Sequence, residues 1–505
     1  MVDVILAKVD TYRPEDVERK RLAPPFALLD LAGALEKAGF SVILHHSEAD
    51  PGNIRELISK IKEHKPLFVG VSVITPHVLS SRAVSLAIKA SCDVPLIWGG
   101  VHPTIVPDQT AKLPFVDAIC IGEGEVTIVE LAQSFREHGL NYDRLAKIPG
   151  LAFTSNGQVT VTPPRPFLET LDGVLPAWHL LQREKYFYPA RYFHSGKGGD
   201  RNTVLNTSRG CPYKCGYCYN QAVHHGHIRC QSPEIVLREI RDLKEKYGVT
   251  GVLFAEDNFF ARPERAMEIV KGIGLPWSSS ITIADLLRAG EGLPAELAKT
   301  GCVELRIGIE SGSLNILRKM RKPHNVAQAL RMARCIADAG IMGVYMFMTG
   351  IPGETWEDTL ATLDMIDELR KISDNIRITG PTFFAPYPAT ELYDAAVAMG
   401  FQPPQDLDGW DKNQPGFHGV IPPYADPRMP KLTFYRILTS PAKMPKTISS
   451  IPVRILRGIA KARWENRSFR FTPEHPLALW GIQVARKLGL KKLVHPLYHR
   501  FFMDV

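Results

Sequence analysis

Three cysteines spaced as C-x-x-x-C-x-x-C are the residues of this sequence with the clearest chemical meaning. Cys211, Cys215 and Cys218 follow an apolar stretch, in a loop that also contains two glycines and a proline. Thiolates are the usual ligands of iron–sulfur clusters. Three of them in one loop can hold three irons of a cubane and leave the fourth iron open to a small molecule.

A zinc knuckle is the competing interpretation, because thiolates also bind zinc and a structural zinc site has four ligands. Four residues close in the sequence could supply the missing ligand: His224, His225, His227 and Cys230. The spacing of the cysteines alone leaves both interpretations open, so the surrounding elements have to decide between them.

Six short apolar strands, separated by helical stretches, are expected to position the cysteine loop. They span residues 203–207, 251–255, 277–281, 304–309, 343–349 and 376–384. Regular alternation of strands and helices indicates a parallel sheet, and six units predict a partial (βα)6 barrel of the TIM type. Chemistry in such barrels gathers at the carboxyl ends of the strands, and the cysteine loop follows the first strand. This placement favours an iron–sulfur cluster over zinc.

Polar and small residues follow the later strands at the same edge of the predicted barrel. Glu256 and Asp257 end the second strand, where either carboxylate could pair with a cationic amino group or cap the next helix. Glu310 ends the fourth strand after an apolar run, where a charge is costly unless it is hydrogen-bonded. Gly350 and Pro352 follow the fifth strand, and the glycine would give a ligand access to the backbone.

The cysteine spacing and the strand-end segments together resemble the radical S-adenosylmethionine (SAM) superfamily over roughly residues 200–400. Residues 385–392, APYPATEL, are similar to the PYPGT segment of many such enzymes, with Ala389 in place of the glycine. The resemblance implies that the three cysteines ligate a catalytic 4Fe-4S cluster and that SAM chelates its fourth iron.

The resemblance also implies the residues that contact SAM. Tyr217 would lie against the adenine, Glu256 or Asp257 would bind the amino group, and Glu310 would bind the ribose. The complete implied set of SAM-binding residues is Tyr217, Glu256, Asp257, Glu310, Ser311, Gly350 and Pro352.

The first 140 residues predict a second α/β unit, a doubly wound, Rossmann-like parallel sheet. Its strands are expected at residues 4–6, 41–44, 67–73, 96–98 and 118–121. Ligands of such sheets sit outside the carboxyl ends of the strands, where this sequence places turns of small residues.

This unit resembles the cobalamin-binding domain that precedes the barrel in one large subclass of radical SAM enzymes. The implied cobalamin-binding residues are Ser72, Thr75, Gly99, Gly100, His102, Gly122 and Glu123. The Asp-x-His-x-x-Gly motif of many cobalamin domains is missing, because residues 9–14 read VDTYRP. The lower axial ligand of cobalt therefore stays open, and so does the alternative that the domain binds no cobalamin.

Four regions are expected along the 505 residues. They are a cobalamin-binding domain at 1–140, a Pro- and aromatic-rich linker at 141–200, the barrel at 201–402 and a basic helical region at 403–505. The chain has 45% hydrophobic and 23% charged residues, which is ordinary for a soluble protein. It shows no apolar run of about 20 residues and no secretory signal, and it has few cysteines for its length. We therefore expect a cytoplasmic protein.

The positive charge is concentrated at the end of the chain. Residues 431–505 contain 15 Lys and Arg against three acidic residues, whereas the whole chain has a net charge of +8. Apolar residues recur at helical spacing within 453–464, with cations between them. Two interpretations stay open: a helix lying on anionic lipid, as a peripheral membrane contact, or a helix whose apolar face covers the barrel mouth. Nucleic-acid binding is not expected, because no stacking platform accompanies the charge.

The resemblance implies that a 5′-deoxyadenosyl radical removes a hydrogen from the substrate and that methylcobalamin then methylates the resulting carbon radical. The predicted function is therefore methylation of an unactivated carbon of a small or lipid-like substrate, with an electron donor such as flavodoxin or ferredoxin. Two alternatives stay open: oxidative cyclisation or rearrangement without methyl transfer, and radical SAM chemistry without cobalamin.

Overall fold

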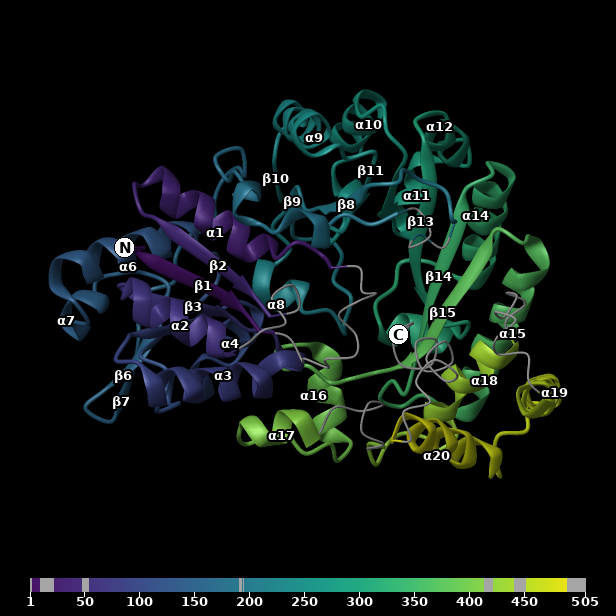
Figure 1. The fold of residues 1–505 in the computed structure, drawn as a ribbon. Helices are drawn as coiled ribbons and strands as arrows, with labels where there is room; N and C mark the ends of the chain where they lie inside the picture. The colour runs from purple at the N-terminus through teal and green to yellow at the C-terminus, as the bar shows by residue number, and fades with distance from the viewer. Residues whose placement is uncertain are drawn as a thin grey trace.

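The computed structural model describes residues 2–9, 22–47, 54–189, 193, 195–412, 421–439 and 451–487. Its N-terminal domain contains a seven-stranded sheet in the order β2-β1-β3-β4-β5-β6-β7, at the left of Figure 1. The five parallel strands are β1 (Val4–Lys8), β2 (Val42–His46), β3 (Phe68–Ser72), β4 (Leu96–Gly99) and β5 (Ala118–Cys120). The longer helices that the structure describes beside them are α1 (Phe26–Lys37), α2 (Ile54–His64), α3 (Val78–Ser91) and α6 (Glu125–His138), and the short α4 (Val101–Ile105) and α5 (Pro107–Ala111) lie between β4 and β5. The doubly wound fold predicted from the sequence is confirmed.

The expected linker at residues 141–200 is wrong in its first part. After α7 (Tyr142–Leu145), β6 (Leu151–Ser155) and β7 (Gln158–Val161) extend the N-terminal sheet as an antiparallel hairpin beyond β5. Leu151, Ala152 and Phe153 are buried there, because both faces of β6 are covered. Pro149 precedes β6 and the other prolines of this region follow β7, and they obscured the two short strands in the sequence.

The second domain is the predicted partial barrel, a six-stranded parallel sheet in the order β15-β14-β13-β12-β11-β8. Its strands are β8 (Asn202–Leu205), β11 (Gly251–Phe254), β12 (Trp277–Ser280), β13 (Cys302–Glu310), β14 (Met342–Thr349) and β15 (Ile376–Phe383). The main helices between them are α9 (Pro233–Tyr247), α10 (Pro263–Gly272), α11 (Ile283–Ala289), α12 (Leu293–Lys299), α14 (Val326–Asp338) and α15 (Trp356–Ile372), with the shorter α13 (Leu314–Lys319) after β13. In Figure 1, α9 and α10 lie at the top and α12, α14 and α15 at the right, around the sheet.

The open barrel leaves two edge strands, and each is covered. On β8, Asn202 and Tyr188 exchange backbone hydrogen bonds of 2.8 and 3.0 Å, so the second part of the linker pairs with this edge. On β15, α18 (Leu432–Thr439) lies against the strand, and Arg436 Nη1 donates to the Ile378 carbonyl over 2.6 Å. Covered edges cannot pair with another chain, which protects the sheet from edge-to-edge association.

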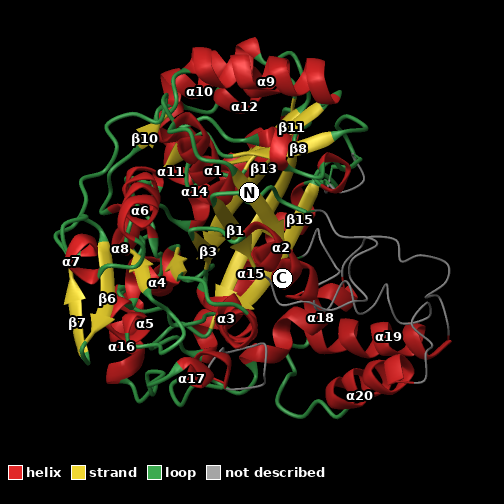
Figure 2. Cartoon of the chain, turned by 60° about the vertical axis from the view of Figure 1, so that its left-hand side comes forward, coloured by secondary structure: helices red, strands yellow, loops and turns green. Residues whose placement is uncertain are grey.

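The C-terminal helices pack on the side of the barrel beside this edge (Figure 2). From α19 (Ile451–Glu465), Trp464 is only 3% exposed, and its Nε1 donates to Asp367 Oδ1 of α15 over 2.9 Å. The last described helix is α20 (Glu474–Lys487). The apolar side of α19 thus covers α15 and α18, and the expectation that it covers the barrel mouth is corrected.

One segment beyond the barrel returns to the N-terminal domain. After α16 (Glu391–Ala398), helix α17 (Leu407–Lys412) packs against α3. Trp410 Nε1 donates to Gln109 Oε1 over 2.8 Å, and Arg82 forms an ion pair with Asp408. Residues 403–412, which the sequence assigned to a separate C-terminal region, therefore belong structurally to the contact between the two domains.

Replacing Trp464 with Ala tests whether the C-terminal region is part of the folded barrel. The change removes a buried indole and its hydrogen bonds to Asp367, so the free energy of unfolding should fall by about 3 kcal/mol in urea denaturation. Ile455→Ala is the matched control, because Ile455 on the same helix is 59% exposed. That control should change the free energy by less than about 0.5 kcal/mol. Equal effects of the two variants would contradict the packing described.

Candidate active site

The cysteine loop lies between β9 (Ser208–Arg209) and α8 (Asn220–His224), at the carboxyl end of β8. Gly210 has φ +88°, and a Cβ there would lie 2.0 Å from the His227 carbonyl oxygen, so the position requires glycine. Gly216 N–H donates to the Met320 carbonyl over 3.0 Å, and its own carbonyl accepts Leu392 N–H over 2.9 Å. These backbone contacts fix the loop between the cysteines against the turns that follow β13 and β15.

The three thiols of the loop are free, half-buried and close to one another. The Cys218 thiol interacts electrostatically with those of Cys215 and Cys211. A structural zinc site needs four ligands on one ion, whereas each cysteine of a cubane ligates a different iron. Three neighbouring thiols at the end of a barrel strand therefore fit a cluster whose fourth iron is open to a ligand.

The two carboxylates after β11 have different surroundings. Glu256 is buried and accepts hydrogen bonds from Thr207 N–H over 2.8 Å and from the hydroxyls of Thr207 and Ser208. Burial raises the pKa of Glu256, although Arg265 and these donors oppose the shift. Asp257 accepts from Gly210 N–H and Tyr219 Oη, each over 2.9 Å, and it lines a cavity. Of the two, Asp257 is placed to meet a ligand, and Glu256 supports the start of the cysteine loop.

Tyr217 and Glu310, both predicted to contact SAM, contact each other. Tyr217 Oη donates to Glu310 Oε1 over 2.8 Å, and Lys322 Nζ lies 3.3 Å from the same oxygen. Although burial opposes it, the Glu310 carboxylate raises the pKa of Lys322. Lys322 was missed in the sequence because it follows other cations in a polar stretch, and nothing there indicated that it would be buried. The three side chains form a closed polar group beside Cys215, whose thiol interacts electrostatically with Glu310 and Lys322.

The remaining predicted SAM contacts, Ser311, Gly350 and Pro352, lie in the turns after β13 and β14. Ser311 is buried, its Oγ lies 2.9 Å from Thr362 Oγ1 of α15, and it accepts Ser313 N–H over 3.0 Å, so it joins the turn after β13 to α15. Gly350 has φ +79°, and its N–H donates to Glu354 Oε2 over 2.7 Å. Pro352 is buried in the same turn. The turn after β14 is thus held by Glu354, whose pKa is raised by burial.

A cavity of about 320 Å³ opens between the two domains. Five of the predicted cobalamin-binding residues line it: Ser72, Gly99, Gly100, Gly122 and Glu123. The barrel contributes Asn206, Arg209, Tyr219 and Asp257 to the same wall. Gly122 has φ +79° and no atom within 4 Å of where its Cβ would be, so its backbone faces open space. Between the sheet and helices α1 and α6 the wall is apolar, which suits an arm of a bulky cofactor.

The other two predicted cobalamin contacts, Thr75 and His102, do not line this cavity. His102 is completely buried, its Nδ1 lies 3.2 Å from Thr75 Oγ1, and its ring meets the edge of Trp410. Burial lowers the pKa of His102 to about 4. Both residues lie at the contact between α17 and the N-terminal domain, and their contact with cobalamin stays a prediction. Residues 10–14, in the region that lacks the Asp-x-His-x-x-Gly motif, lie outside the described residues.

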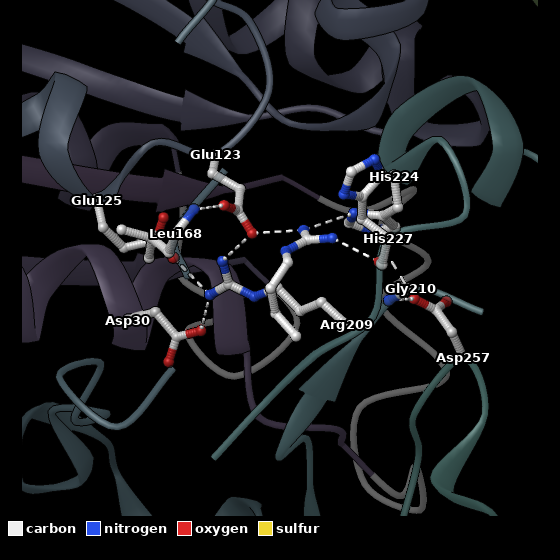
Figure 3. A network of polar contacts seen from close by, with 10 residues as sticks. Asp30, Glu123, Glu125, Leu168, Arg209, Gly210, His224, His227 and Asp257 are labelled. Atoms are coloured by element: carbon white, nitrogen blue, oxygen red, sulfur yellow. Dashed lines mark hydrogen bonds and ion pairs between the residues drawn. The ribbon is translucent and has the colours of Figure 1, made fainter. Parts of the chain in front are cut away.

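A network of buried charges between the domains was missed in the sequence (Figure 3). Arg209 of β9 contacts Asp30 of α1 together with Glu123 and Glu125 at the start of α6. Arg229, on the strand β10 (Arg229–Cys230) that pairs with β9, contacts Glu123 as well. The sequence indicated this network only weakly. Arg209 directly precedes Gly210 and Cys211, but nothing in the sequence of α1 distinguished Asp30 from a surface residue.

Comparisons with known proteins agree with this geometry. The family described as "B12 binding domain" matches residues 17–132, and the family described as "Radical SAM superfamily" matches residues 205–366. An uncharacterized methyltransferase of Pyrococcus horikoshii is 28% identical over 74% of this chain and 79% of its own length. The anaerobic magnesium-protoporphyrin IX monomethyl ester cyclase of Rubrivivax gelatinosus is 27% identical over 73% of this chain and 66% of its own length.

Among solved structures, the methyltransferase TsrM of Kitasatospora setae, with cobalamin and a 4Fe-4S cluster bound, has a similar fold. Its TM-score is 0.62 at 19% identity, over 79% of this chain and 76% of that one. Fold, site and both matched families define a radical SAM enzyme with a cobalamin-binding domain. The B12-binding match lies within residues 17–132 and the radical SAM match within residues 205–366, so each match covers part of the chain. Its cofactors are a 4Fe-4S cluster, SAM and cobalamin.

Replacing Cys215 with Ala should remove one cluster ligand. We expect loss of iron and sulfide from the anaerobically reconstituted chain and loss of 5′-deoxyadenosine formation from SAM. Cys230→Ala is the matched control: Cys230 is also partly buried and near the loop, but it lies on β10 outside the motif. The control should retain both properties. Continued 5′-deoxyadenosine formation by the Cys215 variant would exclude the assigned cluster site.

Proposed function

We propose that this chain methylates an unactivated carbon of a small or lipid-like substrate, using SAM, the cluster and cobalamin. The observation that carries the proposal is the shared cavity. Its wall combines the glycine turns of the N-terminal sheet with residues on both sides of the cysteine motif, Arg209 and Tyr219. A substrate at this junction would be within reach of both cofactor sites, as a reaction that uses both requires.

When bound, the three cofactors supply a carbon-centred radical and a methyl group, which no amino-acid side chain provides. The task of the protein is to bind, orient and exclude water. Cys211, Cys215 and Cys218 would hold the cluster, Asp257 is placed to accept a hydrogen bond from a ligand, and the Gly122 turn leaves room for a bulky cofactor. The apolar wall between the sheet and α1 would keep water from the reacting carbon.

The decisive test is anaerobic reconstitution of the chain with iron, sulfide and hydroxocobalamin, followed by SAM, a reductant and candidate substrates. We expect cobalamin to remain bound after gel filtration, and a methyl group from labelled SAM to appear in one product by mass spectrometry. The control is the same protein without hydroxocobalamin, which should cleave SAM without methylating.

Two other outcomes have distinct meanings. Protein that retains cobalamin but forms a ring or rearranged product without a new methyl group would favour the second candidate function. The relative from Rubrivivax gelatinosus, named as a cyclase, is the reason to keep that candidate. Failure of the protein to retain cobalamin would contradict both functions. Radical SAM chemistry without cobalamin would then be the remaining candidate.

The proposal includes two partners. An electron donor such as flavodoxin or ferredoxin would reduce the cluster. A peripheral membrane contact would involve the C-terminal helices, where large apolar side chains are exposed beside cations: Ile455 is 59% exposed, Phe471 78% and Trp480 64%. A lipid-like substrate would give such a contact a purpose. Within the described part of the chain, no helix is long and apolar enough to cross a membrane.

The membrane contact is testable by sedimentation with vesicles. The protein should bind vesicles containing phosphatidylglycerol and not vesicles of phosphatidylcholine alone, because the binding needs anionic lipid as well as apolar contact. Phe471→Ala combined with Trp480→Ala should reduce binding at least fivefold. Leu86→Ala, at an apolar side chain on α3 that is 45% exposed, should leave it unchanged. Binding that ignores lipid charge, or none at all, would contradict this part of the proposal.

A further inference from the structure

Arg209 connects the cysteine loop of the barrel to the cavity wall of the N-terminal domain. Its backbone lies two positions before Cys211, and the next residue, Gly210, is held by Asp257. Its side chain, only 17% exposed, extends to the N-terminal domain. There Nη2 lies 2.8 Å from Asp30 Oδ2 and also meets Glu125, while Nη1 lies 3.2 Å from Glu123 Oε1 (Figure 3). The guanidinium thus bridges three carboxylates of one domain from a strand of the other.

Arg229 reinforces this bridge from the neighbouring strand. Its Nη2 lies 2.6 Å from Glu123 Oε1, and its Nη1 donates to the His227 carbonyl over 2.7 Å. The same carbonyl is the one that excludes a side chain at Gly210. Glu123 also accepts Leu168 N–H over 2.9 Å. Burial opposes ionisation of Glu123, but Arg229, the Leu168 N–H and Arg209 together lower its pKa. The carboxylate is therefore held charged between the two arginines.

The network contains more carboxyl groups than guanidinium groups. Asp30, Glu123 and Glu125 face Arg209 and Arg229, and Asp30 is almost fully buried. Burial and the nearby Glu125 raise the pKa of Asp30 to about 6, against the attraction of Arg209. Without Arg209 these acids would lose most of their compensation in a poorly solvated place, which is strongly unfavourable. The arrangement therefore tolerates little displacement of β9 relative to α1 and α6.

The same residues form a wall of the shared cavity. Asp30, Glu123, Glu125 and Arg209 all line it. A ligand that orders this wall must order the position of Arg209, and through its backbone the beginning of the cysteine loop. The reverse holds for a cluster that orders the loop. Two sites that order one common element have linked affinities, and the linkage is reciprocal.

We propose that Arg209 is a positioning residue that couples the cobalamin cavity to the cluster loop, so that occupation of either site strengthens binding at the other. This inference rests on the proposed function only in taking cobalamin as the ligand of the cavity. It assigns Arg209 no contact with the reacting atoms. The coupling keeps the two cofactors in one fixed relation across the domain boundary.

The test measures hydroxocobalamin affinity by equilibrium dialysis, for the chain with and without its reconstituted cluster. In the wild-type protein the cluster should tighten binding at least fivefold, in the usual range of coupling between sites. In Arg209→Met the hydroxocobalamin affinity should be about the same with and without the cluster. The electron paramagnetic resonance spectrum of the reduced cluster gives a second readout. It should change on addition of hydroxocobalamin to the wild type and stay unchanged in the variant.

Two further variants keep the test decisive. Arg165→Met is the control matched for the arginine: the Arg165 side chain is 14% exposed, against 17% for Arg209, and it pairs with Glu130 of α6 rather than across the domain boundary. It should retain the wild-type ratio. If Arg209→Met does not fold, Arg209→Lys is measured instead. It keeps the charge, but one ammonium group cannot reproduce the contacts of the guanidinium, so the effect of the cluster on hydroxocobalamin affinity should again be lost.

The inference is overturned if the wild type shows no coupling, or if a folded Arg209 variant retains it. Absence of cobalamin binding in the wild type would overturn the proposed function as well. Coupling lost in the variant while methyl transfer fails in the wild type would contradict the proposed function alone.

Discussion

The carboxyl ends of two parallel sheets face one cavity, and every functional feature of this chain depends on that constraint. Parallel strands leave all their outgoing turns at one edge, so two such edges set against each other gather loops from distant parts of the sequence. The turns after β3, β4 and β5 thereby meet the segment that follows β8. Glu123 and Arg209, 86 residues apart in the chain, are in direct contact for this reason.

The junction between the domains is charged, whereas most buried contacts in proteins are apolar. A buried ion pair gains little stability over well-packed apolar side chains, because its desolvation offsets its attraction. What a buried ion pair adds is selection of one relative position of the two domains, since displaced partners leave uncompensated charges. An apolar junction would permit sliding, whereas carboxylates shared between Arg209 and Arg229 accept few relative positions. Precise placement matters for chemistry divided between two cofactors, where about 1 Å of misplacement is costly.

Much of this could be predicted from the sequence. Apolar periodicity located all eleven parallel strands, and the cysteine spacing located the cluster loop, because both signals are local. The hairpin β6–β7 escaped prediction since its strands are short and stand beside prolines. The Lys322 and Asp30 side chains, 8% and 12% exposed, are buried by distant segments, which no local pattern records. His102 was assigned to the cofactor because it follows a glycine turn, but Trp410, some 300 residues later, occupies its surroundings.

The return of α17 to the N-terminal domain has a consequence for entry into the active site. Besides the charged network at the cavity, the domain is tethered to the barrel by the chain that leads into β8 and through Trp410 and Asp408 on α17. A body tethered at two separated points cannot swing on a single hinge without releasing one of them. Large cofactors and substrates would therefore have to enter while the two sheets keep their mutual orientation. Exchange in such an enzyme is governed by local loop movement, and the scaffold itself can stay closed through a turnover.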